Sequence, residues 1–406
     1  MLEGGVVRDK VFDMIQRNEV ERIVFDEAHS ISTWGDTFRP VHRRVCEEIA
    51  VLPCAKLLLS ATINSRIELQ LKELFGDLSV FRHSVFRENL YLEVSERSSK
   101  LYDDVASYVK DNEGDCGIVY AVLANDVSKI HAELIKREVN AVKYHGQLSE
   151  EVKNSSLDKW MSGQCNIMVA NASFGMGIDR PDVRYIIHAR VPPSMDEYFQ
   201  QCGRAGRDGN PALCRLYYNY ADKTSLYKLF SHQQANLETQ KRELDDLLVF
   251  LENPVQCRHK AVMAYYGETR DNFVCISSCD NCKQRGEFQE NDGTADAAKV
   301  VQSLVELTGI DISCNTLKLF LSKSNQKIIR DNGLENFSNY GILEKKFVPV
   351  IMLEKFLYIL IVQGILTEKV EKKGNSFSFT VTLGPRAHDL LALNMSVNKY
   401  EKASRR

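Results

Sequence analysis

Several absences limit what this sequence can encode. No apolar stretch approaches the roughly 20 residues that span a bilayer, since the longest run extends only from Phe356 to Val362. The N-terminal segment MLEGGVVRDK contains no apolar core of a secretory signal. The net charge is only −3, so a polyanion could be bound only by a local basic surface. These absences predict a soluble intracellular protein with no membrane partner.

The cysteine pattern argues against a disulfide framework. Eleven is an odd count, and several of these residues lie in apolar segments, as expected of reduced thiols inside a cell. Four of them cluster with the spacing Cys257-x17-Cys275-x3-Cys279-x2-Cys282. The two-residue spacing of the last pair is common in tetrahedral zinc sites, so these four thiolates predict one structural zinc ion.

The chain also lacks a Gly-Lys dipeptide, and with it the G-x-x-x-x-G-K motif that cradles nucleotide phosphates. One stretch nevertheless has the character of a nucleotide site, because Ile23, Val24 and Phe25 lead directly into Asp26 and Glu27. The pattern predicts a buried parallel strand whose carboxyl end presents two carboxylates. One carboxylate would hold the water shell of a magnesium ion and the other would orient the attacking water. Alone, such an acidic string is more often a solvated turn.

Alternating strands and helices predict parallel sheets covered on both faces. Strands are expected at 22–27, 55–59, 78–81, 117–120, 141–145, 166–170 and 185–188, with helices at 7–19, 41–52, 67–74, 125–137, 149–162 and 195–202. The pattern becomes helical from about 223, and 287–293 is a predicted polar linker. A small α+β unit follows, with helices near 295–307, 314–321, 325–331 and 346–363 and a hairpin at 373–375.

Two longer strings point to more specific chemistry. Residues 200–209 have the sequence QQCGRAGRDG, in which Arg204 and Arg207 stand three apart at a helix end and can face one ligand. Guanidinium groups directed at a triphosphate stabilise the charge that develops during phosphoryl transfer. Residues 172–184 have the sequence ASFGMGIDRPDVR, a glycine-punctuated loop that allows close backbone contact with phosphates or a sugar.

In order and spacing, DEAH, SISTWGDTFRP, SAT, FGMGIDRPDVR and QQCGRAGRDG resemble the RecQ family of DNA helicases, over about residues 20–395. The resemblance implies a motor in which ATP lies between two RecA-like lobes and single-stranded DNA crosses both. The expected α/β organisation is a partial first lobe (1–85), a second lobe (86–222), a helical zinc-binding module (223–286), an α+β winged-helix domain (287–395) and a disordered tail (396–406).

The resemblance also implies roles for single residues in the first lobe. Asp26 corresponds to the carboxylate of the magnesium site, Glu27 to the general base, and His29 to a link between nucleotide and DNA. Ser60 and Thr62, whose hydroxyls follow a strand and should lie at the same sheet edge as Asp26, would couple hydrolysis to movement.

In the second lobe, Arg207 matches the arginine finger, with Arg204 and Gln200 as its companions. Gly177 and Asp179 lie in the glycine-punctuated loop expected to contact the nucleotide. The implied cofactors are therefore ATP and Mg²⁺, in addition to structural zinc.

Single-stranded and duplex DNA are the expected partners. A polar loop carries two rings and a guanidinium, which offer base stacking and phosphate contact, although the rings could simply anchor the loop to the core. The candidate residues of this loop are Ser32, Trp34, Phe38 and Arg39. In the winged helix the implied DNA contacts are Asn325, Gln326 and Lys327 at a helix start, and Lys373 in the wing.

Two hypotheses about function stay open. The first is the C-terminal part of an ATP-dependent 3′–5′ DNA helicase that acts in recombination, repair and replication in the nucleus. This chain by itself would not hydrolyse ATP, because it lacks the P-loop. The second is a short paralogue that binds DNA or a partner without ATPase activity. Asp26, Glu27 and Arg207 favour the first. The zinc cysteines and winged helix disfavour a DEAH-type RNA helicase. A partial first lobe also predicts an exposed apolar sheet face.

Overall fold

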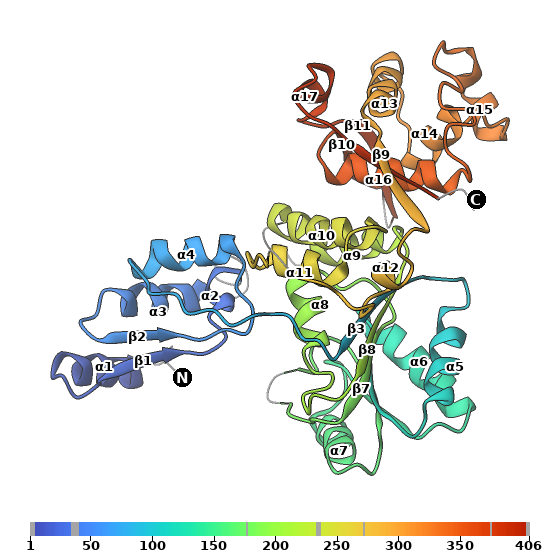
Figure 1. Cartoon of the computed structure of the whole chain (residues 1–406). Helices are drawn as coiled ribbons and strands as arrows, with labels where there is room; N and C mark the ends of the chain where they lie inside the picture. Colours follow the sequence, from blue (N-terminus) through green and yellow to red (C-terminus); the bar gives the residue numbers. More distant parts are fainter. Residues whose placement is uncertain are drawn as a thin grey trace. The chain divides into compact units, whose positions relative to one another are not determined.

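The computed structural model describes residues 5–33, 40–175, 178–232, 237–270, 273–373 and 376–402 (Figure 1). The chain forms two compact units. The first comprises Met1–Glu243 with Arg258–Ser278, and the second comprises Leu244–Cys257 with Cys279–Arg406. None of the described helices combines the length and the apolar character that a bilayer crossing requires.

The first unit opens with a small α/β subdomain. Strands β1 (Arg22–Phe25) and β2 (Ala55–Leu58) pair in parallel, as predicted. Phe25 and Leu58 pack on a small core that includes Ala28, Cys46 and Ile67. The helices are α1 (Gly5–Gln16), α2 (His29–Thr33), α3 (Pro40–Ala50) and α4 (Ser65–Phe75).

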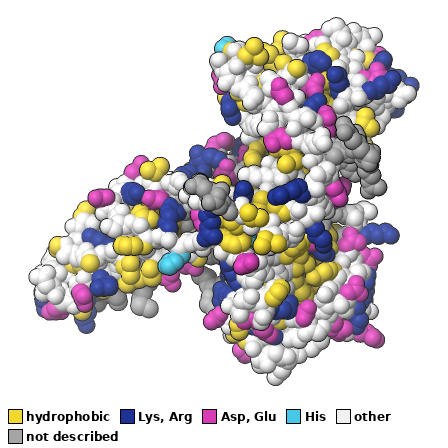
Figure 2. Space-filling view, in the orientation of Figure 1, with side chains coloured by type: hydrophobic (Ala, Val, Ile, Leu, Met, Phe, Trp, Pro, Cys, Tyr) yellow, Lys and Arg dark blue, Asp and Glu magenta, His cyan; other side chains and the backbone are white. Residues whose placement is uncertain are grey.

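The other side of this two-stranded sheet is poorly covered. Val24 and Leu57 are register partners, and they are 50% and 41% exposed. Figure 2 shows hydrophobic side chains on the surface of this subdomain. The predicted exposure of apolar residues on this sheet is therefore confirmed. The strand predicted at 78–81 is wrong, because this irregular segment is not paired in any sheet and Phe81 is exposed.

The second lobe is a six-stranded parallel sheet in the order β3-β8-β7-β4-β6-β5. Its strands are β3 (Leu90–Glu96), β4 (Cys116–Tyr120), β5 (Ala141–Tyr144), β6 (Ile167–Ala170), β7 (Val183–His188) and β8 (Ala212–Tyr218). Every residue of β4 and β6 is buried, which explains their continuous apolar sequences. The helices are α5 (Leu101–Asp111), α6 (Ala124–Lys136), α7 (Glu150–Met161) and α8 (Met195–Cys202). The strands and helices predicted between 117 and 202 are confirmed.

Two helices precede the cysteine cluster along the chain, and two more lie among its cysteines. They are α9 (Asp222–His232), α10 (Leu237–Glu252), α11 (Arg258–Tyr265) and α12 (Asp280–Lys283). In α10, Leu244, Leu247, Leu248 and Leu251 are buried, as their spacing predicts.

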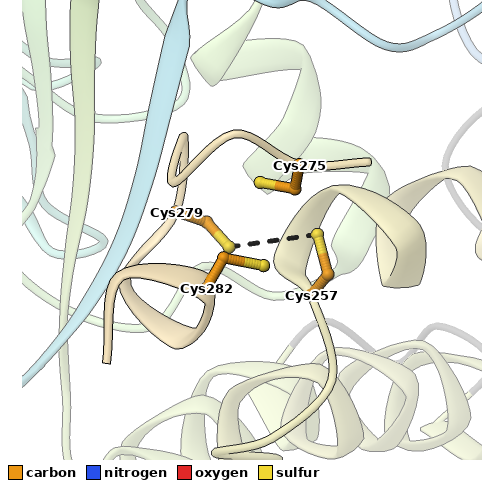
Figure 3. A group of neighbouring side chains, drawn as sticks. All are labelled: Cys257, Cys275, Cys279 and Cys282. Atoms are coloured by element: carbon orange, nitrogen blue, oxygen red, sulfur yellow. Dashed lines mark hydrogen bonds between the residues drawn. The ribbon is translucent and has the colours of Figure 1, made fainter. Parts of the chain in front are cut away.

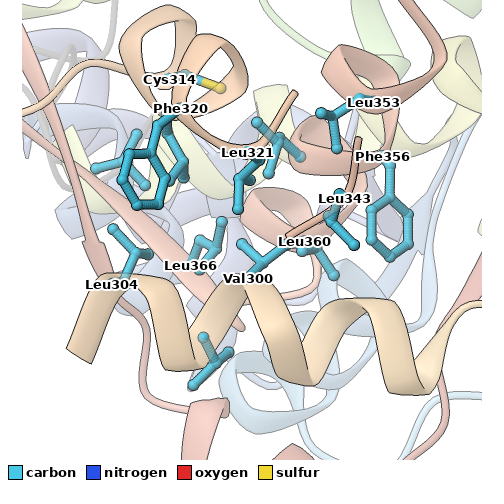
Figure 4. Packing of buried hydrophobic residues seen from close by; sticks show 14 of the residues in the cluster. Val300, Leu304, Cys314, Phe320, Leu321, Leu343, Leu353, Phe356, Leu360 and Leu366 are labelled. Carbon is cyan, nitrogen blue, oxygen red and sulfur yellow. The ribbon is translucent and has the colours of Figure 1, made fainter. Parts of the chain in front are cut away.

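The C-terminal part of the second unit is an α+β fold around one apolar core (Figure 4). Val300, Phe320 and Phe356 come from three different helices and are almost fully buried in this core. The elements are β9 (Phe288–Asp292), α13 (Thr294–Glu306), α14 (Cys314–Leu321), α15 (Lys327–Asp331), a 3-10 turn (Leu334–Asn336), α16 (Ile351–Val362), β10 (Leu366–Lys373), β11 (Ser376–Leu383), α17 (Ala387–Leu391) and β12 (Asn398–Lys402).

Three expectations for this region are corrected. The predicted linker at 287–293 contains β9, which pairs with β12, so the predicted disorder of the tail is wrong for 398–402. Residues 403–406 lie outside the described part. Helix α16 begins at Ile351 and not at 346, since Pro349 offers no backbone N–H and disfavours a helical residue before it.

Candidate nucleotide and metal sites

The two carboxylates of the DEAH string follow β1 directly in a tight turn. Asp26 Oδ1 accepts a hydrogen bond from the backbone N–H of Glu27 over 2.9 Å. Glu27 has a φ of 51°, a left-handed conformation that costs a non-glycine residue about 1–3 kcal/mol. The neighbouring backbone holds this turn in place, because Ala28 N–H donates to Leu59 O over 2.9 Å. Such local strain is typical of functional sites.

His29 connects this turn to the Ser-Ala-Thr segment. Its Nδ1 lies 2.9 Å from Ser60 Oγ and 3.3 Å from Glu27 Oε2. Ser60 Oγ donates its proton to Thr62 O over 3.0 Å, so it accepts from a His29 ring that carries its proton on Nδ1. The structure thus brings together Asp26, Glu27, His29, Ser60 and Thr62, the five residues selected for the nucleotide site of the first lobe.

The two glycine-rich strings of the second lobe also meet. Arg207 Nη1 donates to Ile178 O over 2.9 Å and pairs with Asp179 Oδ1 at 2.8 Å. The backbone N–H of Gly206 donates to Val183 O over 2.8 Å. Gly206 has a φ of 54°, and a Cβ there would lie 2.5 Å from Asn89 Nδ2, so this turn requires glycine.

Arg204 is buried beside the same loop. A Cβ on Gly175 would lie 2.9 Å from Arg204 Nη2, so glycine permits this close approach. Arg204 Nε is buried and has no hydrogen-bond partner among the described residues. A bound ligand, an ion or a water molecule can satisfy such a buried N–H. Gln200 lies near the C-terminal end of α8, and Gly177 lies outside the described residues.

Residues that the sequence did not single out hold this arginine turn. Arg87 Nη1 donates to Gly203 O over 3.2 Å, and its Nη2 donates to Gly206 O. Asn89 Nδ2 donates to Gly206 O and Asn210 O, each over 2.8 Å. Both residues precede the turn by more than 110 positions, so no local sequence signal could reveal the contact.

A buried polar chain supports α8 from the side of β7. His188 Nε2 lies 2.8 Å from Gln201 Oε1, and Gln201 Nε2 donates to Glu197 Oε1 over 2.9 Å. Burial raises the pKa of Glu197 to about 7 and lowers the pKa of His188 to about 4. Both side chains are therefore mostly neutral near pH 6, which removes the cost of burying charge.

Asn64, which follows the Ser-Ala-Thr segment, is a further residue that sequence reasoning missed. It is buried, and its Oδ1 accepts the Ile67 N–H at the start of α4. Its Nδ2 donates to Tyr265 Oη over 3.1 Å, and Tyr265 Oη donates to Asp196 in the first turn of α8 over 2.9 Å. Within the first unit, this side chain therefore connects the end of the Ser-Ala-Thr segment with α8.

The four predicted cysteines converge (Figure 3). The sulfur atoms of Cys257, Cys275, Cys279 and Cys282 all lie within 4.8 Å of one another, and those of Cys257 and Cys279 are 4.0 Å apart. A tetrahedral zinc ion with Zn–S bonds of about 2.3 Å holds its sulfurs about 3.8 Å apart, so the four sulfurs lie within about 1 Å of the spacing that zinc requires. No disulfide forms among the eleven cysteines, all of which are described.

Hydrogen bonds around the cluster fix the segments that carry these cysteines. Asn281 Nδ2 donates to Asn253 O and Gln256 O over 2.8 Å and 2.7 Å. His259 Nε2 lies 3.0 Å from Ser278 O, next to Cys279. Such contacts outside the ligand sphere orient metal ligands in proteins.

The predicted DNA contacts are only partly described. Asn325, Gln326 and Lys327 are exposed at the start of α15, where Gln326 makes no side-chain capping bond. Lys373 is opposite Ser376 in the β10–β11 hairpin, and its side chain is not described. Ser32 lies in α2, also without a described side chain. Three further candidates, Trp34, Phe38 and Arg39, lie outside the described residues.

Known families match the chain in three successive stretches. Residues 100–209 match the helicase conserved C-terminal domain, residues 220–283 match the RecQ zinc-binding family, and residues 287–406 match the RQC domain. The zinc-binding match contains all four clustered cysteines.

Curated relatives match over most of this chain. It is 29% identical over 390 residues to the ATP-dependent DNA helicase hus2/rqh1 of Schizosaccharomyces pombe, covering 93% of this chain and 29% of that protein. It is 31% identical over 378 residues to the ATP-dependent DNA helicase Q-like 4B of Arabidopsis thaliana, covering 88% and 32%. For the ATP-dependent DNA helicase RecQ of Bacillus subtilis the identity is 28% over 347 residues, covering 83% and 57%. The chain thus spans about a third of the length of the first two relatives.

Solved structures give a weaker likeness. S. cerevisiae Dbp5 bound to RNA and ADP BeF3 is 15% identical, with a TM-score of 0.42 that covers 58% of this chain and 67% of that one. At this level the likeness is no evidence about function.

A RecA-like parallel-sheet lobe, a four-cysteine zinc-binding module and an RQC winged-helix domain, in this order, define a class of helicase proteins. The chain belongs to the RecQ family of DNA helicases.

Proposed function

We propose that this chain supplies the arginine-bearing lobe, the zinc module and the winged helix of an ATP-dependent 3′–5′ DNA helicase. The observation that carries the proposal is the meeting of the two glycine-rich strings at Arg207, which pairs with Asp179 at 2.8 Å. An arginine that pairs with an exposed carboxylate can exchange that partner for a phosphate group, as an arginine finger must.

The proposal assigns each group to a step. Asp26 and Glu27 would bind hydrated Mg²⁺ and orient water, and Ser60, Thr62 and His29 would report the nucleotide state to DNA. Arg204 and Arg207, with Gln200, would stabilise charge on the transferred phosphoryl group. The sequence contains no G-x-x-x-x-G-K motif, so this chain alone is proposed to bind DNA without hydrolysing ATP.

DNA is the proposed partner of two regions. The aromatic loop, with Ser32, Trp34, Phe38 and Arg39, would contact single-stranded DNA, and Asn325, Gln326, Lys327 and Lys373 would contact the duplex. Two of the relatives come from eukaryotes, so action in the nucleus, in recombination, repair and replication, is part of the same proposal.

The native protein, purified from its own cells, tests this function. The helicase proposal expects a product well above the 46.2 kDa of this chain that unwinds a 3′-tailed duplex with ATP. A native product of 46.2 kDa that binds DNA but neither unwinds it nor hydrolyses ATP would support a short paralogue that binds DNA or a partner.

A further inference from the structure

The first unit contains a hollow that the nucleotide, zinc and DNA assignments do not use. Its volume is about 420 Å³, within the range of pockets that bury a ligand. It is lined by Phe86, Glu88, Arg270, Phe273, Val274, Ile276 and Ser278.

Ring packing and a hydrogen bond fix the part of the hollow formed by Phe86, Phe273 and Ser278. The ring of Phe86 meets those of Phe273 and His259 edge-on, at centroid distances of 4.7 Å and 5.1 Å. Ser278 O accepts from the backbone N–H of Leu92 in β3 over 3.1 Å. A surface held in this way loses little conformational freedom when a ligand binds.

Hydrogen bonds to Glu268 fix a further part of the lining. Glu268 accepts from Ser84 Oγ over 2.6 Å and from Val85 N–H over 3.0 Å. It also accepts from Arg270 Nε over 2.8 Å, which holds the guanidinium 5.7 Å from the Phe86 ring centroid. Arg270 is therefore positioned at the hollow, where the other N–H groups of its guanidinium can donate to a ligand.

Two aliphatic side chains of the lining are unusually exposed. Val274 and Ile276 are 72% and 81% exposed, while Cys275 between them is buried in the cysteine cluster. This alternation is that of an extended segment with two apolar side chains on one side. Exposed aliphatic groups beside a hollow offer apolar surface that a partner can cover.

The charges of the lining distinguish between classes of partner. Arg270 is the one cation and Glu88 the one carboxylate among the lining residues, and Glu268 pairs with Arg270, so the hollow has no excess of positive charge. A phosphodiester backbone favours clustered cations, whereas an extended peptide can present apolar residues two apart with a charge at each end.

We propose that this hollow binds an extended peptide segment of a partner protein. Two apolar side chains of that segment, spaced i and i+2, would pack on Val274, Ile276 and the Phe86 ring. An acidic residue at one end would pair with Arg270, and a basic residue at the other end would pair with Glu88. The site does not depend on ATP hydrolysis or DNA unwinding.

The test uses the full chain loaded with zinc and a fluorescein-labelled pentapeptide library of the pattern Asp-apolar-x-apolar-Lys. Fluorescence anisotropy should find saturable binders, and the double substitution Val274→Ser with Ile276→Ser should weaken them at least tenfold. Ile135→Ser is the matched control, because Ile135 is a half-exposed aliphatic residue of α6 outside the hollow. One zinc per chain in each variant shows that the module is intact.

A charge exchange makes the test specific. Arg270→Glu should weaken binding of the best peptide at least tenfold, and a peptide with Lys in place of its Asp should recover that loss. Peptide binding that is absent, or that neither substitution changes, overturns the proposal. So does loss of labelled oligo-dT binding in the Val274/Ile276 variant without any peptide binding, since the hollow would then be a nucleic-acid site.

Discussion

Arg207 and Asp179 form an exposed ion pair between two loops, with 2.8 Å between Nη1 and Oδ1 and side chains that are 37% and 83% exposed. Exposed pairs of this kind contribute at most about 1 kcal/mol to stability. The nearby Arg180 is different, because it is buried, stacks on Trp160 at 4.9 Å and donates to Asn166 Oδ1 over 3.0 Å. One arginine is thus available for exchange and the other is part of the core.

This contrast gives a stability prediction. Arg207→Ala should change the free energy of unfolding by less than about 1 kcal/mol, whereas Arg180→Ala should lower it by about 3 kcal/mol because it leaves buried acceptors unpaired. Urea unfolding followed by circular dichroism measures both. Equal losses for the two variants would mean that Arg207 is a structural residue.

The cysteine cluster predicts one zinc ion per chain. Cys279→Ser should reduce the bound zinc to near zero and lower the melting temperature, because the site loses one of four ligands. Cys54→Ser is the matched control, since Cys54 lies outside the cluster. Metal analysis by plasma mass spectrometry is the measurement, and a wild-type chain without zinc would refute the site.

The partly buried carboxyl of Glu197 predicts a pH-dependent stability difference. Its pKa is about 7 in the folded chain and near 4.5 when unfolded, so the folded form binds more protons between these values. The contribution of Glu197 to stability therefore falls as pH rises from about 4.5 to about 7. Glu197→Gln keeps an acceptor for Gln201 and removes the titration.

The Glu197→Gln variant should match the wild type near pH 4.5 and become more stable than it by about 2 kcal/mol above pH 7. Urea unfolding at a series of pH values measures the difference, and comparison with wild type cancels the opposite contribution of His188. A difference that does not depend on pH would show that the pKa of Glu197 is not raised in the folded chain.

The winged helix predicts an electrostatic contact with duplex DNA. Lys327 is exposed at the start of α15, and its replacement by alanine should weaken duplex binding and reduce the salt slope by about one phosphate contact. Lys136→Ala on α6 is an exposed control. Fluorescence anisotropy over a range of salt concentrations measures the duplex affinity of both variants. A salt slope for Lys327→Ala equal to that of the wild type would show that Lys327 does not contact DNA.

Much of the second lobe could be predicted, because a fully buried strand requires a continuous apolar sequence. Strands β4 and β6 are buried along their whole length, so their sequences are continuous apolar runs. The four cysteines were likewise predicted, since their spacing alone indicated a metal site.

The elements that could not be predicted from the sequence depend on residues far away in the chain. Strand β9 is a polar, mostly exposed segment that becomes a strand only because β12 pairs with it about 100 positions later. Arg87 and Asn89 hold the arginine turn across a similar separation. The left-handed backbone of Glu27 also has no sequence signal, because nothing in the string distinguishes it from an ordinary turn residue.

We propose that Asp26 and Glu27 form part of a nucleotide site that cannot hydrolyse ATP without a phosphate-binding loop. DNA-stimulated ATP hydrolysis by this chain, measured with radiolabelled ATP and single-stranded DNA, tests it most directly. We expect this chain to bind DNA and to show no ATP turnover above that of a Glu27→Gln control. Robust turnover that Glu27→Gln abolishes would contradict it, since the chain would then hold a complete active site.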